Sequence, residues 1–319
     1  MKSCAVWIVG ASGLLGGRLR ALARATPGIT LYVLERPLPW NDLSSLASSM
    51  QSEAARFGAW AARFDEWLIF WAAGAGSFGA AAEAMEPELL ATEVLLDECA
   101  LCEGLKSRPG RIGLASSAGA LYSECRDEPV TEDSEALPTT PYGLAKLKQE
   151  KMLSSFCATN RHVVGLAARI STIYGPHRSQ NSERGLVANM ARSIVRRQPL
   201  EVYVPFDTIR DYVYVDDAAQ ALWSRLRRVP PDAGYGIKIV ASERPASISE
   251  IIAVFRRASR RPLVVNRVNR LSALYNRRIT FRSVVEPRDG VGATTSLSVG
   301  IFQVLEAERL FIAQGAARK

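Results

Sequence analysis

Short apolar runs alternate with longer amphipathic segments over the first half of the chain. Each run is too short for a buried helix and is bounded by glycine, proline or polar residues, which is typical of a strand buried on both faces. The alternation predicts a doubly wound α/β fold around a parallel sheet. The predicted strands are residues 5–9, 29–34, 67–72, 111–116 and 163–170.

The alternation changes after residue 176. Residues 185–202 predict a helix followed by a short strand, and residues 248–259 predict another amphipathic helix. We therefore expect two domains. The first is a doubly wound sheet domain, and the second is a smaller α/β lobe. Their expected residues are 1–175 with about 212–240 for the first, and 176–211 with 241–319 for the second.

The sequence GASGLLG follows the first predicted strand directly. A strand, a glycine turn and a helix in this order are the context that a dinucleotide-binding loop requires. Gly10 would form the tight turn, Gly13 would let the backbone approach a pyrophosphate, and Gly16 would allow close helix packing. The helix N-terminus would hold the negative charge. The candidate cofactor-binding residues of this loop are Gly10, Ser12, Gly13, Leu14, Leu15 and Gly16.

A Glu–Arg pair ends the second predicted strand. Glu35 lies nineteen residues after Gly16, where an acidic side chain can bond the adenosine ribose hydroxyls of NAD. Arg36 is the next residue and could instead meet the 2′-phosphate of NADP. Both residues are candidate cofactor-binding residues. We predict NAD as the cofactor from Glu35, and Arg36 leaves NADP open.

Tyr142 and Lys146 are four residues apart in the string PYGLAK, so their side chains project from one face of a helix. Thr140 is a suitable N-cap for this helix, and Pro141 suits its first position. A free tyrosine ionises near pH ~10. A neighbouring ammonium and an oxidised nicotinamide ring would favour the phenolate and make Tyr142 a usable acid/base. Ser117 is twenty-five residues upstream and adds a hydroxyl.

With these motifs placed, the chain resembles the extended short-chain dehydrogenase/reductase family, in its NAD-dependent sugar-nucleotide epimerase/dehydratase branch. The resemblance covers nearly the whole chain and rests on GASGLLG, EWLIFWAAGAG, RIGLASSAGALY, PYGLAK, LAARISTIYGP and RDYVYVDDAAQAL. It implies that Tyr142 is the catalytic acid/base and that Lys146 bonds the nicotinamide ribose. It also implies a catalytic hydroxyl that touches the substrate, supplied by Ser117 or by Ser116.

The resemblance implies that the first domain is a dinucleotide-binding Rossmann domain and that the second is a substrate-binding lobe. It also implies further site residues. EWLIFWAAGAG is similar to the family's fourth strand, whose end lines the cofactor cleft, so Ala72 and Ala73 become candidate cofactor-binding residues. Arg210 would bind a nucleotide phosphate as a bidentate fork. Thr172 would line the substrate pocket, and His177 lies in a loop that approaches the substrate in the family. The resemblance also implies a homodimer formed by the helices around residues 87–104 and 141–158.

The chain departs from the family pattern at several positions. Ala118 stands where the family usually has serine or threonine, and no Asp–Glu pair follows the catalytic hydroxyl, which argues against a 4,6-dehydratase. Thr172 replaces a common asparagine. The third strand is hard to identify because GAWAARF has a poor strand pattern, and Asp42 is a candidate for holding the adenine.

We predict an NAD-dependent enzyme that acts on a nucleotide-linked sugar, most simply a 4-epimerase that retains its cofactor. An NAD(P)H-dependent 4-keto-sugar-nucleotide reductase uses the same groups and remains an alternative. A non-catalytic dinucleotide-binding regulator is the third possibility. The alanine at position 118 favours the regulator, whereas the intact Tyr142, Lys146 and Arg210 favour an enzyme.

Composition narrows the class of protein without naming its substrate. The 319 residues are 48% hydrophobic and 23% charged, as expected of a globular protein without an integral membrane segment, and we expect it in the cytoplasm. Five cysteines fit a reducing compartment, and two histidines predict no metal site. Residues 1–150 carry 13 basic and 19 acidic side chains, a net charge of −6, so the remainder carries +14 of the total of +8.

The basic second half would attract the diphosphate of a sugar nucleotide. Nucleic-acid contact is a weaker interpretation, because the sequence has no aromatic platform or recognised module for it. A membrane surface carrying a lipid-linked sugar pathway is a third interpretation. We expect a nucleotide sugar as the partner of this chain, and no nucleic acid.

Overall fold

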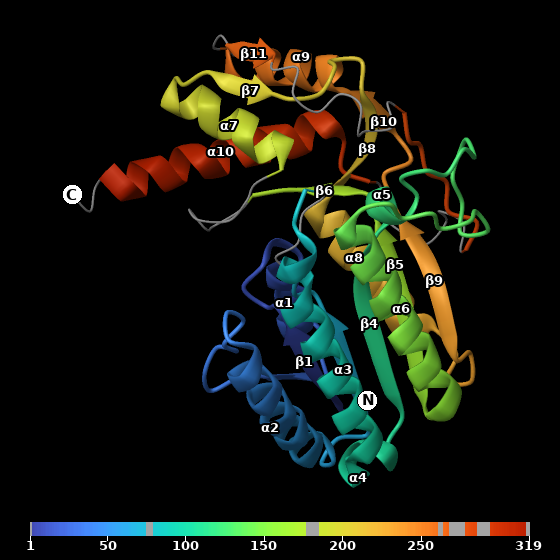
Figure 1. Ribbon diagram of the computed structural model, residues 1–319. Coiled ribbons are helices and arrows are strands. Elements are labelled where there is room, and N and C mark those ends of the chain that lie inside the picture. The colour runs from blue at the N-terminus through green and yellow to red at the C-terminus, as the bar shows by residue number, and fades with distance from the viewer. Residues whose placement is uncertain are drawn as a thin grey trace. The chain divides into compact units, whose positions relative to one another are not determined.

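The computed structural model describes residues 2–74, 79–176, 185–260, 264–267, 278–285 and 294–316. The chain divides into two compact units, each built around its own strands (Figure 1). The first unit comprises residues 1–122, 136–169 and 219–238, and the second comprises residues 123–135, 170–218 and 239–319.

Six strands form the sheet of the first unit. In sheet order they are β2 (Ile29–Tyr32), β1 (Cys4–Val9), β3 (Glu66–Trp71), β4 (Gly110–Ser117), β5 (Val163–Ile170) and β9 (Tyr235–Val240). β1 pairs in parallel with both β2 and β3, and β3 pairs in parallel with β4. All five predicted strands are present, although β2 ends two residues early, at Tyr32. The doubly wound α/β fold is confirmed.

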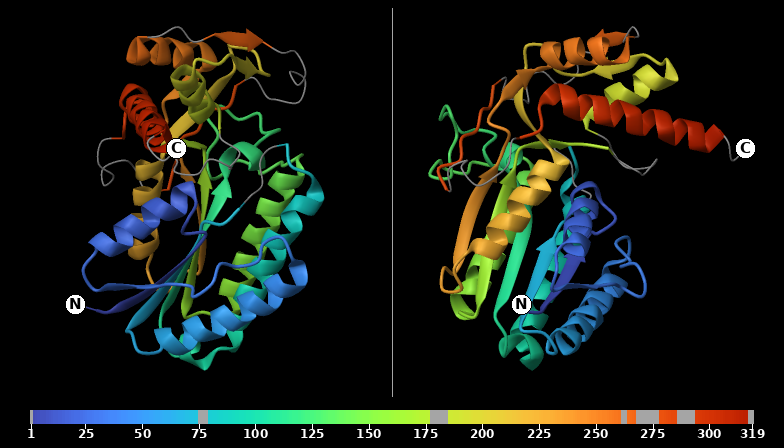
Figure 2. Two further views of the ribbon diagram at one scale, coloured as in Figure 1. Left: turned by 90° about the vertical axis from the view of Figure 1, so that its left-hand side faces the viewer. Right: turned by 180° about the vertical axis from the view of Figure 1, so that it is seen from behind.

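Helices cover both faces of this sheet (Figure 2). α2 (Leu43–Ala61), α3 (Glu86–Leu101) and α6 (Pro141–Thr159) lie on one face, and α3 packs against both of the others. α1 (Leu14–Ala25) and α8 (Val215–Arg228) lie on the opposite face. The short segments are the 3-10 helix η1 (Ala82–Met85), α4 (Glu103–Lys106) and α5 (Ala118–Leu121).

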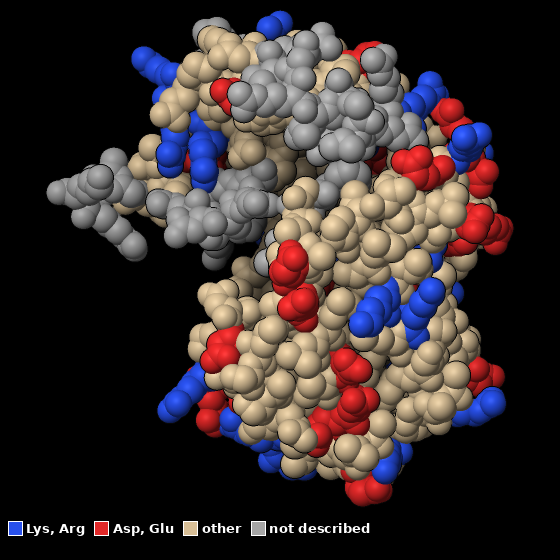
Figure 3. All heavy atoms as spheres, viewed as in Figure 1, with Lys and Arg blue, Asp and Glu red and all other residues tan. Residues whose placement is uncertain are grey.

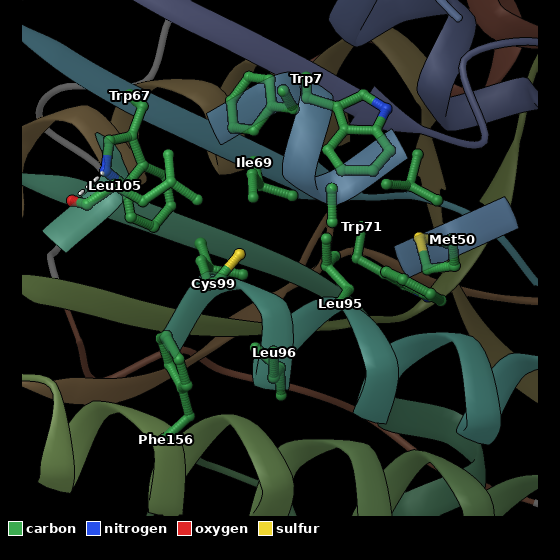
Figure 4. Close-up of a cluster of buried hydrophobic side chains, with 14 of the residues drawn as sticks. Trp7, Met50, Trp67, Ile69, Trp71, Leu95, Leu96, Cys99, Leu105 and Phe156 are labelled. Atoms are coloured by element: carbon green, nitrogen blue, oxygen red, sulfur yellow. Dashed lines mark hydrogen bonds between the residues drawn. The ribbon is translucent and has the colours of Figure 1, made fainter. Parts of the chain in front are cut away.

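The core of the first unit lies between the sheet and α2 and α3 (Figure 4). Every residue of β1 and β5 is buried, which explains why both strands are predominantly apolar; Arg169 is the charged exception in β5. Trp7, Trp67 and Trp71 are at most 2% exposed. The indole nitrogen of Trp67 donates a hydrogen bond to the carbonyl oxygen of Leu105 at 3.1 Å. Burying a large apolar side chain contributes about 2–3 kcal/mol, so these rings hold the sheet to its helices.

The segment between β2 and β3 explains why no third strand was found in the sequence. Asp42 caps α2, which continues to Ala61 and therefore includes most of GAWAARF. In the part of the chain that the structure describes, β2 is the edge strand on this side of the sheet. The poor strand pattern of GAWAARF reflects a helix that buries Phe57 and Ala61 against the sheet.

The described residues of the second unit form two small sheets and three helices. β10 (Pro245–Ser247), β8 (Ile209–Tyr214) and β6 (Thr172–Tyr174) form one sheet, and β11 (Val265–Arg267) and β7 (Leu200–Val202) form the other. The long helix α10 (Leu297–Ala316) packs against α7 (Leu186–Arg196) and α9 (Ile248–Ser259). The helices expected within residues 185–202 and 248–259 are present as α7 and α9.

The sequence positions at which the two units meet differ from the expected boundaries. β6 pairs in parallel with β8, from Thr172 with Tyr212 to Tyr174 with Tyr214, so both strands belong to the second unit. Residues 123–135 also join this unit. The Glu132 carboxylate accepts hydrogen bonds from the backbone nitrogens of Ile239 and Val284, both at 2.8 Å. Strand pairing, which the sequence does not reveal, sets these boundaries.

Charged side chains of opposite sign lie on neighbouring helices of the first unit (Figure 3). α3 exposes Glu86, Glu93 and Asp97, whereas α6 exposes Lys148 and Lys151. α6 also exposes an apolar side chain, that of Leu144, to 54%. None of the described helices is long and apolar enough to span a lipid bilayer.

Candidate active site

The glycine loop has a backbone that only glycine accommodates at two positions. Gly10 has a φ of +86°, and a Cβ there would lie 2.5 Å from the backbone nitrogen of Ala73. A Cβ on Gly16 would lie 2.1 Å from the carbonyl oxygen of Gly10. The loop therefore packs directly against the segment that follows β3. This close approach places Ala72 and Ala73 beside the predicted cofactor loop.

The N-terminus of α1 completes the features of a pyrophosphate site. α1 begins at Leu14 after Gly13, and no side chain caps it. The first backbone N–H groups of a helix have no partners within the helix and carry a partial positive charge, so they favour an anion. An uncapped N-terminus next to a glycine loop fits the pyrophosphate of a dinucleotide.

The Glu–Arg pair after β2 is connected to α2 by residues that the sequence did not reveal. The Glu35 carboxylate forms an ion pair with Arg56, which also pairs with Glu53 at 2.8 Å. Tyr32 donates a hydrogen bond to the same Glu53 at 2.8 Å. Arg36 is exposed. Two guanidinium groups therefore belong to this region: that of Arg36, the next residue in sequence, and that of Arg56, which reaches Glu35 from α2.

Asp42 is engaged in the backbone of α2. Its carboxylate accepts hydrogen bonds from the Ser45 nitrogen at 3.3 Å, the Ser45 hydroxyl at 2.6 Å and the Ser44 hydroxyl at 2.9 Å. These hydrogen bonds from Ser45 and Ser44 lower the pKa of Asp42. The residue that we considered for the adenine is thus an N-cap, which is a sufficient reason for an aspartate at this position.

The two candidate serines at the end of β4 point to different environments. Ser116 is buried, and its hydroxyl donates a hydrogen bond to Glu150 at 2.6 Å. Ser117 is half-buried and caps α5, where its hydroxyl accepts a hydrogen bond from the Ala120 nitrogen at 3.4 Å. Ala118 is fully buried. Of the three positions, Ser117 is therefore the one with a hydroxyl that is neither buried nor held by a carboxylate.

Tyr142 and Lys146 lie on α6, which begins as expected. Thr140 caps the helix through a hydrogen bond from the Gly143 nitrogen at 3.1 Å, and Pro141 is its first residue. A Cβ on Gly143 would lie 2.7 Å from the carbonyl oxygen of Ala120 in α5. The first turn of α6 therefore packs closely on α5, directly after Ser117. This contact brings the helix that carries Tyr142 to the end of β4.

Lys146 is buried between α6 and α3. Its ammonium nitrogen lies 5.7 Å from the centroid of the Tyr142 ring, and only 3% of the residue is exposed. The same ammonium forms an ion pair with Glu88 and a hydrogen bond with the Gln149 side-chain oxygen at 3.1 Å. Tyr142 itself is half-buried. The predicted phenol and ammonium are thus neighbours, and a carboxylate that was not predicted joins them.

A second buried ion pair lies beneath the serines. Arg169 of β5 binds the Glu150 carboxylate with two nitrogens, Nη2 to Oε2 at 2.7 Å and Nε to Oε1 at 3.1 Å. Its remaining terminal nitrogen donates to the Tyr122 hydroxyl at 2.5 Å. Because Ser116 donates to the same carboxylate, the network connects β4, β5 and α6. It fixes the elements that carry Ser117 and Tyr142.

The two predicted substrate residues lie on one sheet of the second unit. Thr172 begins β6 and is exposed. Arg210 lies in the adjacent strand β8 and donates a hydrogen bond to the carbonyl oxygen of Ile209 at 2.7 Å. Its neighbour Asp211 is fully buried and accepts hydrogen bonds from Ser171 and Ser242. His177 lies outside the described residues.

A dinucleotide loop, a Tyr-x-x-x-Lys helix and a serine at the neighbouring strand end define the class of short-chain dehydrogenases and reductases with a Rossmann-type sheet. A family model for the NAD dependent epimerase/dehydratase family matches residues 6–237. The chain belongs to this family of enzymes.

Relatives of known activity include both isomerases and reductases. A dTDP-4-dehydro-6-deoxyglucose reductase of Escherichia coli is 31% identical over 116 residues, which are 36% of each chain. A UDP-glucose 4-epimerase of Streptomyces lividans is 26% identical over 178 residues, which are 51% of this chain and 52% of the relative. The chain thus spans between a third and about half of the length of these relatives.

The fold of the whole chain is similar to that of a solved epimerase. The structure of UDP-glucose 4-epimerase from Thermotoga maritima with UDP-glucose matches with a TM-score of 0.77. The match covers 97% of this chain and 99% of the other at 18% sequence identity. At this identity the likeness establishes the shared architecture.

Proposed function

We propose that the protein is an NAD-dependent 4-epimerase of a nucleotide-linked sugar. One observation carries the proposal: the half-buried Tyr142 phenol has the buried Lys146 ammonium at its ring, on a helix packed against the segment that follows Ser117. A phenol beside an ammonium is suited to taking a proton from a sugar hydroxyl and returning it. When bound, NAD would supply the hydride acceptor that the oxidation of the sugar and its reversal need.

The residues of this chain divide the remaining work. Gly10, Gly13 and the N-terminus of α1 would hold the pyrophosphate, and Glu35 would accept hydrogen bonds from the adenosine ribose. Ser117 would donate a hydrogen bond to the oxygen that Tyr142 deprotonates. Arg210 would bind a phosphate of the sugar nucleotide through its guanidinium.

The proposal is tested with the purified protein and pairs of 4-epimeric sugar nucleotides. We expect NAD to be retained through purification and detected by mass spectrometry after denaturation. We also expect at least one pair, with UDP or dTDP as the nucleotide, to interconvert without added cofactor. Reduction of a 4-keto-sugar nucleotide that consumes one added NADPH per turnover, in a protein that interconverts no epimeric pair, would contradict the proposal.

That result would establish the second candidate, a 4-keto-sugar-nucleotide reductase. Arg36 and the similarity to the Escherichia coli reductase support it. The exposed guanidinium of Arg36 could bind the 2′-phosphate of NADP. The two candidates differ in the fate of the cofactor, which is retained in an epimerase and released after each turnover of a reductase.

We further propose that the chain forms a homodimer through α3 and α6. In a two-fold symmetric dimer, α3 of one copy can face α6 of the other. The acidic side chains of α3 would then lie opposite the basic side chains of α6. Leu144 adds an exposed apolar contact. We expect Leu144→Glu to convert the dimer to a monomer in light scattering after size-exclusion chromatography. Leu101→Glu changes an exposed residue at the C-terminal end of α3. Comparing its oligomeric state with that of Leu144→Glu shows where along the two helices the interface lies.

A further inference from the structure

Glu88 is a buried carboxylate that has no role in the proposed reaction as described above. It lies in the first turn of α3 and is 6% exposed. It forms an ion pair with Lys146, whose side chain comes from α6, fifty-eight residues further along the chain. The ordinary reason for an acid in the first turn is the helix dipole, which needs no burial and no partner. Burial against the ammonium therefore calls for another explanation.

The surroundings of the pair form a closed hydrogen-bond network. Gln149 accepts from the Lys146 ammonium at 3.1 Å and donates to the Thr92 hydroxyl at 2.7 Å. Thr92 donates to the backbone carbonyl oxygen of Glu88 at 2.7 Å. Two residues of α3 and two of α6 thus hold one another. The ammonium is fixed in place by side chains that are themselves fixed.

Glu88 also contacts the segment after β3. A Cβ on Gly74 would lie 3.2 Å from the Oε2 oxygen of Glu88 and 3.4 Å from its Oε1 oxygen. Gly74 follows Ala72 and Ala73, which pack against the glycine loop. The carboxylate therefore lies where the proposed cofactor segment, α3 and the catalytic helix meet.

We propose that Glu88 is a positioning residue that serves as the fixed counter-ion of Lys146 and keeps this buried ammonium protonated beside Tyr142. The inference concerns the same site as the proposed epimerase. An ammonium removed from water without a partner loses its proton readily, whereas a nearby carboxylate favours the charged form. Burial by itself would lower the pKa of Lys146, but the charge and hydrogen bond of Glu88 raise it above its ordinary value.

The other charged groups around Lys146 do not replace Glu88. Tyr142 and Glu150 face it from α6. Tyr142 is uncharged until its phenol ionises, and Glu150 is bound by two nitrogens of Arg169. Gln149 is neutral. Among the described residues, Glu88 is the carboxylate that pairs with the Lys146 ammonium, and in its absence we expect burial to favour the neutral amine.

The first test is the pH dependence of stability, which requires no turnover. In the wild type the pKa of Lys146 is raised in the folded state. The contribution of Lys146 to the free energy of unfolding is therefore constant at every pH below the pKa of lysine in the unfolded chain, ~10.4, and so does not change between pH 7 and 9. In Glu88→Gln the folded pKa falls below the unfolded one, so the unfolded chain binds more protons and stability rises with pH. We expect its Tm to rise by about 2–4 °C from pH 7 to 9, measured against Glu88→Gln/Lys146→Met.

The second test is the pH profile of kcat with the sugar nucleotide that the protein converts. We expect Glu88→Gln to move the alkaline fall of kcat down by about one pH unit or more, because the ammonium is lost earlier. Glu88→Asp keeps the charge and should restore the profile in part. Glu86→Gln removes an exposed carboxylate from the same helix turn and should change neither profile.

The outcomes separate the inference from the proposed function. A Tm that is independent of pH in Glu88→Gln, with an unchanged kcat profile, overturns the role of Glu88. A Tm that rises with pH in a protein that converts no sugar nucleotide supports the ion pair and rejects the epimerase. If Glu88→Gln does not fold while the double variant does, the buried ammonium without its partner is the cause, as the proposal requires.

Discussion

We expect Tyr142→Phe to abolish turnover and to leave the cofactor bound. The substitution removes one oxygen atom, and with it the group that would exchange a proton with the sugar hydroxyl. General acid/base catalysis contributes about 10²–10⁴-fold to a rate, so we expect kcat to fall by about 1,000-fold or more. Tyr142 is half-buried and the phenyl ring keeps its apolar contacts, so the fold and the NAD content should not change. Steady-state rates and mass spectrometry of the denatured protein measure the two effects.

A matched control comes from an exposed tyrosine of the second unit. Tyr203 is 42% exposed and hydrogen-bonds Glu201, and Tyr203→Phe should leave kcat within about twofold of the wild type. A Tyr142→Phe protein that keeps a tenth of the wild-type rate would show that another group carries the proton. Loss of NAD together with activity would instead show that the phenol is needed for binding.

The sequence predicted the elements whose signal is local. The strands β1 and β5 are recognisable because every residue in them is buried, and GASGLLG is recognisable because Gly10 and Gly16 have no room for a side chain. The cap of α6 is a contact between Thr140 and Gly143, three residues apart. Patterns of this kind are complete within one stretch of the chain.

The sequence did not predict the partners that come from distant segments. Glu88 forms an ion pair with Lys146, which lies fifty-eight residues further along the chain. Arg56 of α2 forms an ion pair with Glu35, which follows β2. Each partner looks like an ordinary surface charge in its own stretch of sequence. Nothing local distinguishes Glu88 from the exposed Glu86 two positions earlier, because only the packing of α3 on α6 decides which of them is buried.

The choice between Ser116 and Ser117 depends on the direction of the side chains. Neighbouring residues on a strand point to opposite faces, so only one serine can share an environment with the buried Glu150. The structure gives this place to Ser116. The sequence shows that Ser116 and Ser117 face opposite sides of the sheet. Which side each one faces depends on how β4 pairs with β3, and the sequence does not contain this information.

The buried face of α6 changes from polar to apolar along its length. Its first half buries Lys146, Gln149 and Glu150, and its second half buries Leu153 and Phe156. A hydrophobic pattern therefore identifies only the second half as facing the core. Polar residues on the buried face of the first half are tolerated because each of the three has a hydrogen-bond partner. The departure from the usual amphipathic pattern coincides with the candidate site.

Breaking the buried ion pair between Arg169 and Glu150 is expected to lower the free energy of unfolding strongly. Arg169→Met removes the guanidinium and leaves Glu150 buried with an unpaired charge. Breaking a buried ion pair in this way typically costs about 3–5 kcal/mol, so we expect the free energy of unfolding in urea to fall by this amount. Lys106→Met, which breaks the exposed pair with Glu103, should cost less than about 1 kcal/mol.

The companion variant Arg169→Met/Glu150→Leu removes both charges and should recover most of the lost stability, because the cost arises from the isolated carboxylate. The Tyr122 hydroxyl loses its hydrogen bond from Arg169 in both variants, whereas the Ser116 hydroxyl loses its acceptor only in the double variant. A recovery of stability in the double variant therefore reports the removal of the isolated charge, because the lost Ser116 hydrogen bond acts against it. A single variant as stable as the double variant would show that solvent or Lys146 neutralises Glu150 in place of Arg169. The ion pair would then not be needed to hold the end of β4, and Ser117 would be held in position by its role as the cap of α5.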